Sequence, residues 1–92
     1  MNSFSVIKEK ITVPQAAEFY GIKSKNGMCR CIFHVEKTPS MKLYPHNYHC
    51  FGCGEHGDVI NLVEYLFELE SIGAAKKLNE DFGLGLDLII QQ

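Results

Sequence analysis

Apolar positions recur at helical spacing near the start of the chain. Thr12 followed by Gln15 forms a capping-box pair, and Pro14 falls in the first turn that such a box opens. A glycine at position 21 is a natural C-terminal stop. We therefore predict a helix over residues 12–21. Its apolar face comprises Val13, Ala16, Ala17 and Tyr20.

The second half of the chain repeats this spacing twice. Asp58 is suited to the N-cap of a helix over residues 58–70. Ser71 can cap another helix over residues 71–83, which Gly83 would end. The apolar face of the first comprises Val59, Leu62, Val63, Leu66 and Phe67, and that of the second Ile72, Ala75, Leu78 and Phe82.

Between the helical stretches the pattern changes to strict alternation. Residues 40–44 alternate polar and apolar, residues 45–47 suit a turn, and residues 48–51 alternate again, which predicts a β-hairpin. The sequence therefore indicates an α+β fold, a small antiparallel β-sheet flanked by helices. We expect one domain over residues 1–92, with the sheet region over about 27–56.

Composition indicates an ordinary globular protein, with 46% hydrophobic and 22% charged residues in a chain of 92. No apolar run is long enough to cross a bilayer, and the first ten residues lack the pattern of a signal peptide. These features predict a cytoplasmic location and no membrane partner. In that reducing compartment, the four cysteines favour a metal site over disulfides.

The net charge of −2 conceals an asymmetry along the chain. Residues 23–56 carry five cations against two acids, whereas residues 57–92 carry seven acids against two lysines. All four histidines also lie in the middle segment. An anionic partner would therefore approach the middle of the chain.

Two pairs of metal-ligating residues lie in that middle segment. Cys31 and His34 are separated by two residues, and so are Cys50 and Cys53. Each spacing lets one tight turn direct two donor atoms at a single ion, and two such turns supply a tetrahedron suited to Zn²⁺. Four protein ligands close the coordination shell, so we predict one structural zinc ion and no catalytic one.

Other residues could compete for a place in this site. Cys29 could replace Cys31 only by losing the tight-turn spacing, and we rank His46, His49 and His56 below His34 as the fourth ligand. The flanking glycines 52 and 54 could adopt left-handed backbone angles that direct amide N–H groups at the sulfurs.

The motifs continue around the two ligand pairs. A Glu-Lys-Thr-Pro-Ser stretch occupies residues 36–40, Tyr-His-Cys-Phe-Gly-Cys-Gly occupies 48–54, and His-Gly-Asp occupies 56–58. With the Cys-x-x-His pair, this series resembles the N-terminal zinc-binding domain of bacterial (DnaG-type) DNA primases. The chain departs from the family pattern at Cys29, Ile32 and Met41, where Gly, Pro and Phe are usual.

The resemblance implies a zinc ribbon whose sheet surface contacts single-stranded DNA template and assists a separate polymerase domain in starting primers. The partner would be a primase polymerase domain or a replicative helicase on another chain. The sequence holds no acidic polymerase domain, so we expect a binding module and not an enzyme. A free-standing protein and a piece of a longer primase both fit the sequence.

Nucleic-acid contacts need cations for phosphates and aromatic faces for bases. Strand alternation places Lys42 and Tyr44 on one face, and the resemblance favours Lys37 as a phosphate contact. We expect Phe51 to belong to the core, and Tyr48 suits either role. The candidate nucleic-acid-binding residues are Lys37, Lys42, Tyr44, Arg30 and Tyr48.

A rival hypothesis is a protein-interaction adaptor whose zinc ion only holds the fold. It would dock on a replication or mobile-element partner through an acidic helical face. That face comprises Glu64, Glu68, Glu70, Glu80 and Asp81.

Overall fold

The structure of the chain is a computed structural model that describes residues 3–34 and 37–88. Four helices and a four-stranded antiparallel sheet make up the described chain, as the α+β prediction requires. Glu36, the first residue of the Glu-Lys-Thr-Pro-Ser stretch, lies outside the described residues. The elements follow in the order α1 (Ser3–Lys10), α2 (Val13–Phe19), β1 (Met28–Cys29), β2 (Met41–Leu43), β3 (Tyr48–Cys50), β4 (His56–Gly57), α3 (Val59–Phe67) and α4 (Ser71–Asp81).

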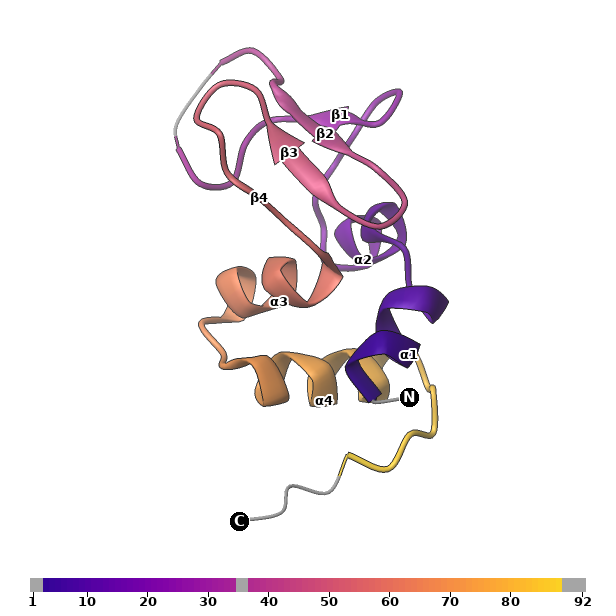
Figure 1. Ribbon diagram of the computed structural model, residues 1–92. Coiled ribbons are helices and arrows are strands. Elements are labelled where there is room, and N and C mark those ends of the chain that lie inside the picture. Colours follow the sequence, from indigo (N-terminus) through magenta and orange to yellow (C-terminus); the bar gives the residue numbers. More distant parts are fainter. Residues whose placement is uncertain (1–2, 35–36, 89–92) are drawn as a thin grey trace.

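The molecule is elongated, with the sheet at one end and α1, α3 and α4 at the other (Figure 1). Helix α2 lies between the two ends. The strands are in the order β1-β2-β3-β4, each antiparallel to its neighbour. Every connection therefore joins neighbouring strands, and both ligand pairs come to the sheet end of the molecule.

The predicted hairpin is present. Met41 pairs with Cys50 and Leu43 with Tyr48 across β2 and β3, and all four side chains face the core. In the turn between the strands the amide of Tyr44 donates to the carbonyl of Asn47. Because successive side chains alternate, the residues between these core positions face outward.

The N-terminus of α2 is closed by the capping box that the sequence predicts. Thr12 Oγ1 accepts from the Gln15 amide, and Gln15 Oε1 accepts from the Thr12 amide. The first amide of the helix, that of Val13, donates to the Pro45 carbonyl in the hairpin turn. Gly21 follows the helix at φ +89°, a backbone conformation that favours glycine. This capped helix therefore ties the hairpin to the rest of the chain.

A second capping box, between Asp58 and Asn61, opens α3. The prediction for α4 was partly wrong, because Glu70 and not Ser71 occupies its N-cap. The hydroxyl of Ser71 donates instead to Glu64 Oε2 on α3. The end of α4 is joined to α2 by a hydrogen bond of 2.7 Å from Tyr20 Oη to Asp81 Oδ2.

Helix α1 was not predicted from the sequence. It packs against α3 and α4, buries Ile7 completely, and pairs Lys8 with Asp58 at 3.1 Å. One apolar core runs through the whole described chain, from Ile7 and Leu78 in the helices to Met41 and Cys50 in the sheet. The zinc-ligand region is thus an extension of the core and not a separate lobe.

Candidate metal centre and nucleic-acid surface

The structure brings together the four donors of the two predicted pairs. Ligand atoms of Cys31, His34, Cys50 and Cys53 all lie within 4.8 Å of one another, in the only such group of three or more potential ligands among the described residues. The sulfurs of Cys31 and Cys53 are 3.6 Å apart. Tetrahedral zinc with Zn–S bonds of about 2.3 Å needs sulfurs roughly 3.8 Å apart, so the cluster has the dimensions of a zinc site.

Each of the two loops that carry the ligands is anchored to the rest of the fold by its own contacts. Cys50 ends β3 and is completely buried, and its amide donates to the Glu55 carbonyl. In the other loop Phe33, between the two ligands, stacks on Tyr48 with ring centroids 5.6 Å apart and contacts Tyr65 of α3 at 4.3 Å. The aromatic stack anchors the Cys-x-x-His turn to the core, which restricts the donor atoms before any ion binds.

The pKa values of the two buried thiols, Cys31 and Cys50, are shifted in opposite directions. Burial raises the pKa of the Cys31 thiol to about 12, although the Phe33 amide, which donates to its sulfur over 3.3 Å, opposes the shift. Burial also opposes ionisation of Cys50, but the Ser40 hydroxyl 3.4 Å from its sulfur and two following backbone amides lower its pKa to about 6. The surroundings of Cys50 therefore favour the thiolate more than those of Cys31 do.

These four donors are positioned to bind one zinc ion. Neutral imidazole and thiolate are ligands that zinc prefers. The hydrogen bonds to the sulfurs and the stacking of Phe33 on Tyr48 orient these ligands, and the hydrogen bonds also moderate the thiolate charge. A bound zinc ion in such a closed site supplies folding energy rather than an open coordination position. Its binding displaces the thiol protons, so the apparent affinity rises with pH.

The glycine prediction was half right. Gly54 has φ +85°, but its amide donates to the Cys50 carbonyl rather than to a sulfur. Gly52 does not adopt a positive φ. A Cβ on Gly52 would lie 2.9 Å from Ser40 Oγ and 3.3 Å from two atoms of the His34 ring. Gly52 is thus required for close packing beneath the histidine ligand.

The competing ligands lie elsewhere. Cys29 is buried in β1 opposite Met41, outside the four-donor cluster. His46 is exposed in the hairpin turn, and His49 faces away from the buried side of β3. The ring of His56 lies 3.2 Å from the carbonyl of Gly54, through Nδ1.

A four-stranded antiparallel ribbon with a Cys-His-Cys-Cys donor set defines the class of zinc ribbons. Within that class, the family model described as the CHC2 zinc finger, the DnaG zinc ribbon, matches residues 2–91. The chain belongs to this family of primase zinc-binding domains, as the motifs predicted. Family membership supports a nucleic-acid-binding role.

Similar proteins include DNA primases from several bacteria. The chain is 37% identical over 90 residues to the DNA primase of Thermotoga maritima, covering 89% of this chain and 15% of that protein. It is 49% identical over 57 residues to the DNA primase of Chlamydia trachomatis, covering 55% of this chain and 10% of that protein. The chain thus spans only a small fraction of these curated relatives.

Among solved structures, the fold is similar to the crystal structure of the Aquifex aeolicus primase (zinc binding and RNA polymerase domains). The TM-score is 0.81 at 27% sequence identity, over 96% of this chain and 23% of that one. The described residues contain no helix with the length and apolar character needed to span a membrane.

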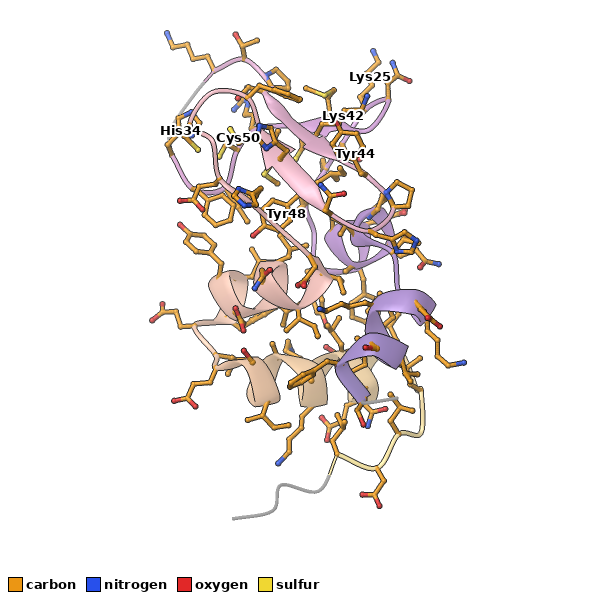
Figure 2. The ribbon with its side chains drawn as sticks, in the orientation of Figure 1. Lys25, His34, Lys42, Tyr44, Tyr48 and Cys50 are labelled. Carbon is orange, nitrogen blue, oxygen red and sulfur yellow. The ribbon has the colours of Figure 1, made fainter. Side chains whose placement is uncertain are left out.

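One face of the sheet carries two of the five candidate nucleic-acid residues, Lys42 and Tyr44. Lys42 is opposite His49 in the sheet, and His49 is opposite His56. Lys42 Nζ lies 5.2 Å from the centre of the Tyr44 ring; Lys42 is the middle residue of β2 and Tyr44 directly follows the strand (Figure 2). We call this surface the outer sheet face; it comprises Lys42, Tyr44, His49, Phe51 and His56.

The structure decides the role of Tyr48, which the sequence left open, and shows that the prediction for Phe51 was wrong. Tyr48 is only 2% exposed and belongs to the core, so it is not available to a base. Its burial, together with the nearby Glu55, Asp58 and Glu64 carboxylates, raises its pKa to about 12. Phe51 is instead 63% exposed and packs edge-on against His49 at 4.6 Å. The alternation of β3 could have shown that Tyr48 shares the buried side with Cys50.

The remaining predicted cations are not among the residues of this face. Arg30 and Lys37 are exposed in the segment around the Cys-x-x-His turn, and no described contact joins either to Lys42. Met41, the departure from the family's usual Phe, is completely buried on the inner side of the sheet. A ring at that position would pack in the core rather than stack on a base.

The acidic helical face is partly engaged inside the protein. Glu64 accepts hydrogen bonds from Asn61 and Ser71, and Asp81 accepts one from Tyr20 and pairs with Lys77 at 3.3 Å. The exposed acids left for a partner are Glu68, Glu70 and Glu80.

Proposed function

We propose that this chain is a non-catalytic, zinc-stabilised module that binds single-stranded DNA template in primer synthesis. Its zinc ion is held by Cys31, His34, Cys50 and Cys53, and its template surface is the outer sheet face. The observation that carries the proposal is the exposed Phe51 beside His49, in a row that ends at Lys42 and Tyr44.

Such a surface has the two components that a single strand needs. An exposed ring costs solvation free energy unless something covers it, and base–aromatic stacking contributes about 1–3 kcal/mol per base. Lys42 supplies a cation for a phosphate at the same edge. Strand β3, which carries His49, ends at the buried ligand Cys50, so the zinc site holds this strand and the rings on it rigidly in place.

The module would act with a polymerase domain. The similar crystal structure of the Aquifex aeolicus primase comprises zinc binding and RNA polymerase domains, and this chain aligns with 23% of it. The segment that matches is the zinc-binding part of primases, which supports a role for this chain in binding and not in polymerisation. A replicative helicase partner and a phosphate contact at Lys37 stay predictions.

The direct test is a fluorescence-anisotropy titration of the zinc-loaded protein with a short labelled oligothymidylate at low and moderate salt. We expect binding whose logarithmic salt slope is about −0.7 per phosphate contact. The variant Lys42→Gln/Phe51→Ala should bind about tenfold or more weakly, because it removes one phosphate contact and one stacking ring.

A matched control is Lys76→Gln/Phe19→Ala, which removes one exposed cation and one exposed ring from the helical part of the chain. This control should bind like the unmodified protein. Equal losses in both variants would contradict the outer sheet face as the binding surface. No binding by the zinc-loaded protein at low salt would contradict the proposed function and favour the adaptor hypothesis.

A further inference from the structure

A groove runs along the edge of the sheet beside β1, where the backbone of Lys25 bridges Met28. It has a volume of about 620 Å³ and is bounded by the loop that follows α2 and by the segment around the first ligand pair. Its floor is apolar and includes Ile22, Met28, Ile32 and Pro39. Nothing in the zinc site or on the outer sheet face accounts for this hollow.

The rim of the groove is cationic. Lys23, Lys25 and Arg30 line it, all three are exposed, and no acidic residue is among its lining. These cations form no ion pair with a carboxylate among the described residues. An adjoining hollow of about 560 Å³ shares the loop and adds Glu18 at its far side. Within the part of the chain that the structure describes, these cations lack an acidic ion-pair partner, so the groove is suited to an anionic ligand.

The groove adjoins the outer sheet face directly. Met28, on its floor, is the residue opposite Lys42 in the β1–β2 pairing. Since β1 is the edge strand, a chain that leaves Lys42 sideways crosses Met28 and reaches the cations beyond it. Lys25 extends from the loop before β1, at the same end of the molecule as Lys42 (Figure 2).

We propose that the single strand held on the outer sheet face continues over β1 and places its next phosphates in this groove, against Lys23, Lys25 and Arg30. The apolar floor would receive a base or sugar face, and the three cations would receive the phosphodiester charges. This inference rests on the proposed function and adds to it a direction for the strand and a second contact region.

The test compares two lengths of oligothymidylate on the zinc-loaded full chain. Single-strand sites span roughly 4–16 nucleotides, so one probe of about 4 covers the outer sheet face and one of about 12 also reaches the groove. We expect the longer probe to bind more tightly than its larger number of equivalent binding positions alone would explain. Its affinity should also depend more steeply on salt. In Lys23→Gln/Lys25→Gln this extra salt slope should fall by about 0.7 per lost contact, with binding of the short probe unchanged.

The control Lys10→Gln/Lys76→Gln removes the same charge from exposed helix positions and should keep the length advantage. A groove variant that keeps the full length advantage overturns the inference while leaving the proposed function intact. Absence of binding by the unmodified protein to either probe overturns both. A third outcome is that free thymidine triphosphate competes with the probe, that the groove substitutions abolish this competition, and that the length advantage stays intact. This outcome would assign the groove to a mononucleotide and would also overturn the strand path.

Discussion

At the scale of single residues, the zinc site depends on side chains that never touch the ion. Ser40 contacts the sulfur of Cys50, and the missing side chain of Gly52 leaves room for the His34 ring. Phe33 fixes the turn between the first two ligands by stacking on Tyr48. Such outer contacts orient donors and tune their basicity, and they are where single substitutions should reveal the design of the site.

Substitution of Gly52 by alanine should weaken zinc binding by about tenfold or more, because the added Cβ would meet Ser40 Oγ at 2.9 Å and the His34 ring at 3.3 Å. Competition with a chromophoric chelator measures the affinity, and the visible spectrum of the Co²⁺-substituted protein reports the ligand geometry. Gly54→Ala is the control, since its Cβ meets nothing within 4 Å and suffers only left-handed strain of about 1–2 kcal/mol. Identical cobalt spectra for Gly52→Ala and the unmodified protein would refute the packing argument.

Removal of the Ser40 hydroxyl should raise the pKa of Cys50 from about 6 toward its ordinary value of 9.0. A lowered pKa in the folded state stabilises the metal-free protein above pH 9.0, and this contribution disappears as the pH falls through about 6. In Ser40→Ala this contribution should be smaller and should be exhausted at a higher pH, and zinc affinity at neutral pH should decrease roughly 10-fold. Thiolate absorbance against pH measures the first effect, with Ser24→Ala as the control; coincident titration curves for the two variants would contradict it.

At the scale of elements, short helices are stabilised by their ends. Helix α2 and helix α3 have seven and nine residues, too few to be stable alone, and both begin with a reciprocal capping box. The other contacts of α2 reach across the chain, from Val13 to the hairpin turn and from Tyr20 to Asp81 on α4. Caps therefore set where each helix begins, and these links set how the helices meet the ribbon.

The Asp58 cap should be worth more than the ion pair that the same carboxylate makes. Asp58→Ala removes the acceptor for the Asn61 amide at 2.8 Å and should lower the free energy of unfolding by about 0.5–2 kcal/mol. Lys8→Ala removes only the exposed pair at 3.1 Å and should cost at most about 1 kcal/mol. Urea unfolding at one fixed free zinc concentration compares the two variants, and a larger loss in Lys8→Ala would reverse the assignment.

At the scale of the whole molecule, positive and negative charge are concentrated at opposite ends of its long axis. The cationic segment of the sequence forms the zinc ribbon at one end, and the acidic segment forms α3 and α4 at the other (Figure 1). A strand of nucleic acid is attracted to the ribbon end and repelled from the helical end, which limits how it can approach. The acidic end is left for contacts of another kind, as the adaptor hypothesis requires.

The sequence was most informative where structure is local. The ligand pairs, the hairpin, the Thr12–Gln15 capping box and the Asp58 N-cap each depend on residues a few positions apart, so local pattern alone predicted them. Helix α1 was missed because it depends on packing of Ile7 against distant helices rather than on a strong local pattern. Phe51 was misplaced because a ring between two metal ligands was expected in the core, although alternation continued past Cys50 would place it outward with His49.

Zinc removal should lower the local stability of the ribbon end much more than that of the helical end. The ion can contribute on the order of 10–16 kcal/mol to a site of this kind, and the ribbon has only short strands of its own. The helical end keeps Ile7, Leu62 and Leu78 completely buried without help from the ligands. We therefore expect a chelator to abolish hydrogen-exchange protection in β2 and β3 while the amides of α3 and α4 keep much of theirs. Chelator saturated with zinc is the control, and added zinc should restore the ribbon. Simultaneous loss of protection in both ends would show that the continuous core makes the chain one cooperative unit.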